Sequence, residues 1–330
     1  MKVNTSDWKT PLFKSIKIAL AAILGIAIAA ELKLPNSATA GLITILSIRN
    51  TKRETIKSAV NRVLAYACAL LIAGGSFVLL DFTLWGFACF LFFFSMVCIF
   101  LGWGECLSVN AVLMSHFLLA GNMKPELIWS ESLLLMIGSA LGILVNLHLH
   151  KKGAEFDRLA AEVDDQIKGI IHRMSQWLPK EDKREYTSSC FAKLETALEN
   201  AKKCAAENYN NTFRREDSFE LDYITMRERQ SIILKEIYEN IVRIQYLPKQ
   251  ANQVAAILDE IEKAYHRENT VEGLLEKLAV LFLEMEKEPL PESREEFEAR
   301  AILFYILMQI KNLLEVKREF VLARGNNVCR

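Results

Sequence analysis

Paired cysteines, catalytic motifs and the alternating pattern of β-strands are all missing from this sequence of 330 residues. Its seven cysteines are an odd number without CxxC spacing, which fits neither a disulfide framework nor a zinc site. The second half has no HExxH, GxSxG, P-loop or GxGxxG motif, and no catalytic constellation stands out in the first half. We therefore expect neither an enzyme nor a bound metal or cofactor.

Charge is scarce in the first half of the chain. Residues 1–150 contain 11 Lys and Arg and 7 Asp and Glu, a net charge of +4, whereas residues 151–330 contain 29 and 33, a net charge of −4. The 52% hydrophobic content is higher than in an ordinary soluble enzyme. We predict a transmembrane domain at 1–150 and a cytoplasmic domain at 151–330. No nucleic-acid partner is expected.

Apolar runs long enough to cross a bilayer, about 20 residues, occur four times in the first half. They cover residues 16–30 (extended a little at each end), 63–80, 82–101 and 127–149. Two weaker runs accompany them. The run 38–48 is short enough to be re-entrant, and the run 107–120 contains Asn110 and His116.

Basic segments between these runs predict their orientation, because cytoplasmic loops carry an excess of Lys and Arg. The N-terminal flank, the loop 49–62 and the residues after the last run are all basic, so all three should lie inside. Two crossings must then precede the loop 49–62, which requires the run 38–48 to cross, extended from residue 32. We predict six crossings in a bacterial inner membrane, with both ends of the domain inside.

The second half has the apolar spacing of amphipathic helices, with Phe156, Leu159, Val163, Ile167 and Ile170 on one stripe. Further helices are predicted at 181–209, 217–247, 249–267, 270–288 and 293–323. The apolar run 301–310 is too short to cross a bilayer and is interpreted as a core helix. The fold class is therefore all-α, a six-span domain followed by a cytoplasmic helical bundle.

The segment 11–64 resembles the start of the aromatic acid exporter family, relatives of the fusaric-acid-resistance-like transporters. One matching feature is a Pro-x-Ser turn (Pro35, Ser37), followed by a short second span with Ala40 and Gly41. The others are a Thr-Lys-Arg segment (51–53) and an arginine at the start of the third span (Arg62). Relatives tend to carry Gly shortly after that arginine, where this chain has Ala65, Tyr66 and Ala67.

This resemblance implies export of small organic acids, with aromatic carboxylates as candidates, by secondary transport. Relatives with two fused copies imply that a single six-span copy pairs with itself, so a homo-oligomer such as a dimer is expected. The lipid bilayer and the organic acid would be the other partners.

Three parts of the first half are candidates for binding an anion: a turn at 35–37, one arginine and a group of loop cations. Pro35, Asn36 and Ser37 could place a helix N-terminus, with its free N–H groups, inside the membrane region; the alternative is an ordinary turn. Arg62 could bind a carboxylate in a bidentate manner, although orientation of the span and snorkelling of the side chain are the favoured explanation. The loop cations set the topology and could also attract the cargo; they are Arg49, Lys52, Arg53 and Lys57.

Two polar residues and three glycines complete the candidates. Asn110 and His116 lie six residues apart, on different faces of one helix, and His116 could relay a proton or simply bond between helices. Gly25, Gly138 and Gly142 indicate close helix contact, within the fold or between subunits.

An alternative to export remains open. The spans could be an anchor for a sensor or scaffold whose cytoplasmic helical domain is the functional output. A membrane enzyme acting on lipids is a weaker alternative, because no catalytic constellation is present.

Overall fold

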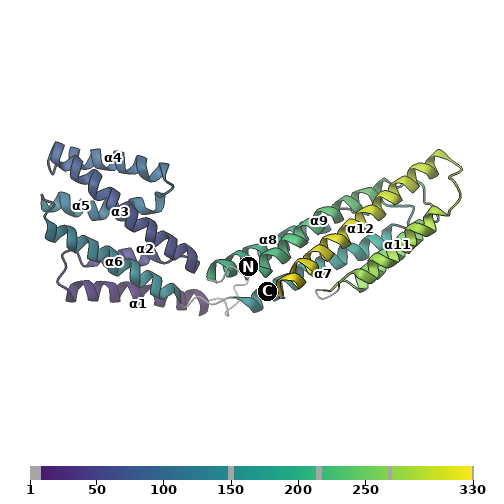
Figure 1. Cartoon of the computed structure of the whole chain (residues 1–330), viewed down its shortest axis with the longest axis horizontal. Coiled ribbons are helices and arrows are strands. Elements are labelled where there is room, and N and C mark those ends of the chain that lie inside the picture. Colours follow the sequence, from purple (N-terminus) through teal and green to yellow (C-terminus); the bar gives the residue numbers. More distant parts are fainter. Residues whose placement is uncertain (1–8, 148–151, 213–217, 267–269, 329–330) are drawn as a thin grey trace. The chain divides into compact units, whose positions relative to one another are not determined.

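The structure, a computed structural model, describes residues 9–147, 152–212, 218–266 and 270–328. These residues form twelve helices and no strand, so the all-helical prediction is confirmed (Figure 1). The chain divides into two compact units. The N-terminal unit holds residues 1–151 and 210–213, and the C-terminal unit holds residues 152–209 and 214–330.

The N-terminal unit contains six helices. They are joined by short turns at alternate ends, an up-and-down arrangement (Figure 1). They are α1 (Lys9–Glu31), α2 (Ala38–Ser47), α3 (Lys52–Leu80), α4 (Leu84–Phe100), α5 (Gly104–Ala120) and α6 (Pro125–Leu147). Within the described residues, α3 and α6 are long and apolar enough to cross a membrane, while α2, α4 and α5 are shorter apolar helices.

Residues 49–62 were predicted to form a basic loop, but most of them are helical. The prediction of a loop is therefore wrong. Helix α3 begins at Lys52, because the Thr51 hydroxyl accepts a hydrogen bond from the Glu54 backbone N–H, 3.3 Å away. The Glu54 carboxylate adds a favourable charge to the first turn. Lys52, Arg53, Lys57 and Arg62 therefore lie on the first turns of α3, and only Arg49 precedes the helix.

The turn before α2 also differs from expectation. Lys33 and Asn36 have φ values of 54° and 61°, which a right-handed helix cannot contain, so α2 does not extend back to residue 32. Pro35 lies in this turn rather than in a helical turn. Ser37 is the N-cap residue but makes no side-chain capping bond. The predicted side-chain cap is therefore absent, and the side-chain amide of Asn36 donates instead to Glu131 of α6.

Small residues bring α6 against α2 and α1. A Cβ on Gly138 would lie 2.6 Å from Ile43 Cβ and 2.8 Å from the Ala40 carbonyl oxygen. A Cβ on Gly142 would collide with Ser47, and one on Gly25 would lie 2.9 Å from Thr44 Oγ1. These glycines thus serve close packing within a single copy of the chain.

Gly138→Ala should destabilise the N-terminal unit by about 1–3 kcal/mol, the usual cost of forcing an extra carbon into a packed core. Gly75→Ala is the matched control, because nothing lies within 4 Å of its new Cβ and alanine is the better helix former. Thermal unfolding of the detergent-solubilised protein measures both. Equal melting temperatures for the two variants would show that α2 and α6 do not pack this closely.

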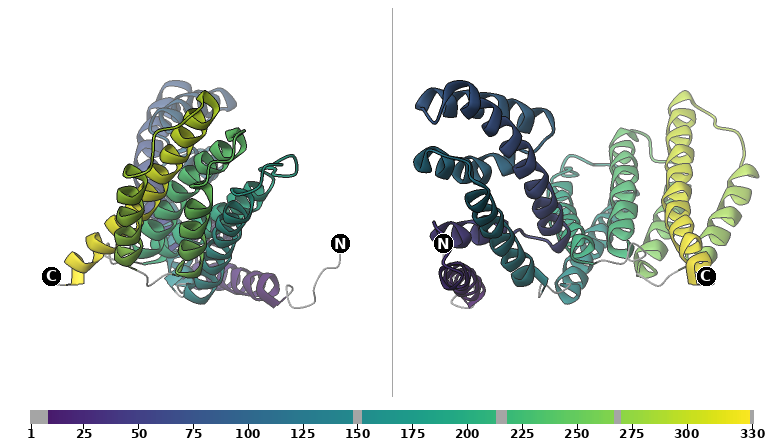
Figure 2. Two further views of the ribbon diagram at one scale, coloured as in Figure 1. Left: turned by 90° about the vertical axis from the view of Figure 1, so that its right-hand side faces the viewer. Right: turned by 60° about the vertical axis from the view of Figure 1, so that its left-hand side comes forward.

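The C-terminal unit is a helical bundle around one continuous apolar core. Its helices are α7 (Gly153–Trp177), α8 (Cys190–Asn211), α9 (Phe219–Arg243), α10 (Ala251–Lys263), α11 (Glu272–Glu286) and α12 (Arg294–Val328). Helix α9 packs against α7 and α12, and α11 lies alongside α12 (Figure 2). The apolar stripe predicted on α7 faces this core, with Phe156, Val163 and Ile167 all buried.

The predicted helix 181–209 begins only at Cys190. Side chains of α9 hold the preceding segment in an irregular conformation. The Tyr238 hydroxyl donates to the Thr187 carbonyl oxygen at 2.6 Å, and the Tyr238 ring stacks on Tyr186 with 3.8 Å between centroids. These tertiary contacts outweigh the helical tendency of residues 181–189.

Candidate functional site

A fully buried carboxylate lies near the start of α6. Glu131 has no exposed surface, and its Oε2 is 2.8 Å from Nδ1 of His116 on α5. Its Oε1 accepts a hydrogen bond of 3.2 Å from the side-chain amide of Asn36, in the turn between α1 and α2. The structure thus brings together two of the predicted site residues, Asn36 and His116, through a third that the sequence analysis did not select.

The Glu131–His116 contact requires a proton. An oxygen and a ring nitrogen 2.8 Å apart form a hydrogen bond only if one of the two atoms carries hydrogen. The side chain of Tyr66, on α3, lies nearby, and its hydroxyl donates to the Ile128 carbonyl oxygen at 3.4 Å. The pair can therefore hold a proton inside the helix bundle and can pass it on if the surroundings change.

A buried cation lies at the C-terminal end of α2. The guanidinium of Arg62 donates to the Ser47 hydroxyl and to the Leu46 carbonyl oxygen, the latter at 3.0 Å, and only 1% of the residue is exposed. The negative end of the helix dipole favours a cation here. Among the described residues, however, no carboxylate pairs with Arg62, and its Nε has no hydrogen-bond partner.

A cavity of about 510 Å³ is lined by Asn61, the residue before Arg62, although Arg62 itself does not line it. It is formed by the connection before α3, the first turns of α3, the turn between α4 and α5, and the start of α5. Two cations, Arg49 and Lys57, and two carboxylates, Glu54 and Glu105, line it together with Trp103. The Arg49 guanidinium lies 2.6 Å from the Glu105 carboxylate, so these two charges largely neutralise each other.

The remaining predicted residues are more dispersed. Lys52 and Arg53 do not line the cavity, whereas Ser58 and Asn61, two residues that the sequence analysis did not select, do. Asn110 is fully buried and donates to the Cys106 carbonyl oxygen at 2.9 Å.

The cavity wall is fastened to the end of α6. The amide of Asn146 donates to the Arg49 carbonyl oxygen at 2.7 Å and to the Thr55 hydroxyl at 2.5 Å. Because Glu131 lies near the first turn of α6 and Asn146 near its last, the proton-holding pair and the cavity are at opposite ends of this helix.

Sequence reasoning selected the partners of Glu131 but not Glu131 itself. The available signal was a carboxylate within the otherwise apolar run 127–149, because a charge there is costly and needs a partner. Reading that run only for its hydrophobicity concealed the signal.

Comparison with known proteins assigns the chain. The model described as "Aromatic acid exporter family member 1" matches residues 12–149, and the model described as "Putative aromatic acid exporter C-terminal domain" matches residues 154–318. The chain belongs to the aromatic acid exporter family. The resemblance read from the sequence is therefore confirmed, and the family description is one of transport rather than catalysis.

One curated relative and one solved structure are similar over different extents. The "Uncharacterized protein YqjA" of Bacillus subtilis (strain 168) is 27% identical over 308 residues, which are 93% of this chain and 95% of the relative. A solved structure, the "Crystal structure of putative membrane protein from Clostridium difficile 630", shares 24% identity with a TM-score of 0.44. That similarity covers 49% of this chain and 96% of the solved one.

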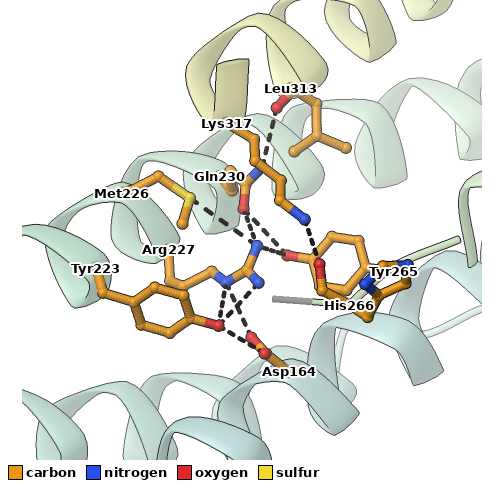
Figure 3. A network of polar contacts seen from close by, with 9 residues as sticks. All are labelled: Asp164, Tyr223, Met226, Arg227, Gln230, Tyr265, His266, Leu313 and Lys317. Atoms are coloured by element: carbon orange, nitrogen blue, oxygen red, sulfur yellow. Dashed lines mark hydrogen bonds and ion pairs between the residues drawn. The ribbon is translucent and has the colours of Figure 1, made fainter. Parts of the chain in front are cut away.

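The C-terminal unit of this member of the aromatic acid exporter family contains a buried polar network centred on Arg227 of α9 (Figure 3). The Arg227 Nε lies 2.9 Å from the Asp164 carboxylate on α7. Its Nη1 donates to Gln230 Oε1 at 2.7 Å and to the Tyr265 hydroxyl, just after α10, at 2.5 Å. Gln230 in turn donates to the Leu313 carbonyl oxygen of α12 at 2.9 Å. The network therefore fixes the register of these helices.

A second buried cation, Lys317 of α12, lies beside this network (Figure 3). It is 3% exposed, and its ammonium donates to the His266 carbonyl oxygen at 2.5 Å. Burial, with the charge of Arg227 adding to it, lowers the pKa of Lys317 to about 8. An ordinary lysine has a pKa of about 10.4.

This lowered pKa predicts a pH dependence of stability. Between pH 8 and about 10.4 the unfolded chain binds one proton more than the folded chain, so the free energy of unfolding should rise with pH, by up to about 3 kcal/mol. Lys317→Met should remove this rise, whereas Lys311→Met, at an exposed position on the same helix, should keep it. Urea unfolding of the C-terminal unit at several pH values measures it. A rise that persists in Lys317→Met would assign it to another group.

Proposed function

We propose that this protein exports small organic anions across a bacterial inner membrane, with aromatic carboxylates as candidate cargo. The observation that carries the proposal is Arg62, a buried guanidinium without a carboxylate partner among the described residues. Burying an unpaired charge is costly. Asn61, the residue before Arg62, lines a polar cavity, and a cargo anion that enters this cavity could supply the missing charge during transport.

Apolar side chains on the N-terminal unit support its place in a membrane. Many are more than three-fifths exposed, among them Leu71, Val78, Leu79, Phe92, Ile99, Phe100 and Leu119. Apolar surface of this extent is unusual on a soluble protein. With 17 residues each, α4 and α5 extend about 26 Å, close to the thickness of the hydrocarbon core. Six crossings with both ends inside remain the topology we propose.

Secondary transport requires a site that exchanges a driving ion, and the Glu131–His116 pair has that character. Ionisable groups buried in membrane helices commonly mark proton relays. In the proposed topology the start of α6 faces the outside and its end faces the cytoplasm. A proton would then enter from the outside at Glu131, while the cargo anion would enter from the cytoplasm through the cavity beside Arg62.

The exporter would work as a homo-oligomer, such as a dimer, with the C-terminal domains in the cytoplasm as assembly or gating elements. The Gly25, Gly138 and Gly142 contacts are made within one chain, so other surfaces would have to join the subunits. A sensor or scaffold with an anchoring membrane unit is the alternative. It gives no role to an unpaired arginine beside a cavity.

Uptake into inverted membrane vesicles tests the proposal, because inversion turns export into accumulation. We expect vesicles containing the protein to accumulate labelled 4-hydroxybenzoate when a proton gradient is imposed, and matched vesicles lacking the protein not to do so. No accumulation across a panel of aromatic and aliphatic acids would overturn export and favour the sensor.

A further inference from the structure

We propose that the C-terminal unit carries a divalent transition-metal site between α7 and α10, formed by His172, Asp259 and Glu262. His172 lies on α7, and the two carboxylates lie on α10, one helical turn apart and on the same face. Each residue offers one donor atom, and the three donor atoms all lie within 4.8 Å of one another. Donor atoms that bind one ion at about 2.0–2.2 Å lie within about 4 Å of one another. Small movements of these three side chains would therefore bring their donor atoms into coordination.

The charges around these side chains also favour a cation. The His172 Nδ1 lies 3.2 Å from a Glu262 carboxylate oxygen, and this is the single ion pair that either carboxylate makes with a described residue. The neighbouring Glu260, in contrast, pairs with Lys277 at 2.7 Å. No described Lys or Arg therefore neutralises Asp259 or Glu262, and a bound divalent ion would balance both.

One imidazole and two carboxylates select among metal ions. Calcium and magnesium prefer oxygen donors alone, whereas imidazole with carboxylate suits Zn²⁺, Ni²⁺, Co²⁺ or Fe²⁺. All three side chains are at least partly accessible, so an ion can reach them and water can complete its coordination. An ion bound here would clamp α7 to α10. No local chelating motif marks the site in the sequence, because His172 and the α10 pair come from separate segments of the chain.

Titration of the purified full-length protein with ZnCl₂, after removal of any affinity tag, tests the site. Isothermal titration calorimetry should show one zinc per chain, with no comparable heat from Mg²⁺ or Ca²⁺. His172→Ala and Glu262→Gln should each weaken binding more than about tenfold, because each removes a direct ligand. His266→Ala and Glu260→Gln are matched controls from the same region and should bind zinc as the wild type does.

A second readout identifies the ligands directly. Co²⁺ bound at this site should give visible absorption bands that His172→Ala removes and His266→Ala keeps. Metal-free melting temperatures should be the same in all variants, because the substituted side chains lie outside the core. Zinc that binds His172→Ala as tightly as wild type would overturn the proposal, because the ion would then bind elsewhere on the chain. So would a wild-type protein that binds no zinc.

Discussion

Glu131→Gln should reduce proton-driven accumulation of 4-hydroxybenzoate in inverted vesicles to nearly the background of vesicles lacking the protein. Glutamine has the size of glutamate and can still accept the Asn36 hydrogen bond. It cannot gain or lose a proton at ordinary pH, so it cannot couple a proton gradient to the cargo. Exchange of labelled for unlabelled cargo without a gradient should persist, because exchange needs no net proton transfer.

His116→Gln should act more mildly, by flattening the pH dependence of uptake. The carboxylate would remain, but it would lose the imidazole that shares a proton with it across 2.8 Å. Glu126→Gln is the matched control, because Glu126 is an exposed carboxylate on the first turn of the same helix. It should transport as the wild type does.

The amount of each variant in the vesicle membrane must be equal for this comparison, which an immunoblot checks. Proton-driven uptake that survives Glu131→Gln would exclude this carboxylate as the coupling group while leaving export itself intact. Loss of exchange together with driven uptake would instead mean that Glu131 holds the bundle together.

The spacing of apolar residues predicted the helices correctly wherever the tertiary packing agrees with the helical propensity of the segment. The apolar stripe from Phe156 to Ile170 faces the core as its spacing predicts, because a helix can bury such a stripe on only one side. The segment before Cys190 did not follow its helical tendency, because Tyr238 and Tyr186 hold it by contacts between distant parts of the sequence.

In the candidate site, single residues could be predicted from the sequence, but their contacts could not. Asn36 and His116 could be selected singly, because a polar group in an apolar run stands out. That both would meet at Glu131 depends on three segments folding together, and on a φ of 61° at Asn36 that no sequence pattern specified. The helical start of α3 was missed for a smaller reason, since Thr51 and Glu54 are a local capping signal hidden among the cations.

Arg62→Gln should raise the cargo concentration for half-maximal uptake about tenfold or more, because a hydrogen bond to a charged partner contributes about 1.5–3 kcal/mol. The burial of Arg62 adds a second reason to expect a large effect. Arg62 is buried rather than exposed at the mouth of the cavity, so an anion reaching it would lose water and gain a stronger interaction. Lys124→Gln, an exposed lysine between α5 and α6, is the control and should leave uptake unchanged.

The same substitution should leave the protein abundant in the membrane. Removing one partner of a buried ion pair is usually destabilising because it leaves the other charge unpaired, but Arg62 has no carboxylate partner among the described residues. Glutamine ends two bonds short of the Nη2 atom that donates to the Leu46 carbonyl oxygen, so this hydrogen bond is lost, but the cost of burying a charge is lost with it. Arg62→Lys keeps the charge but loses the planar fork, and should fall between wild type and Arg62→Gln. If Arg62→Gln folds and transports normally, Arg62 serves the end of α2 alone, and the cargo anion must be bound by Arg49 or Lys57 in the cavity.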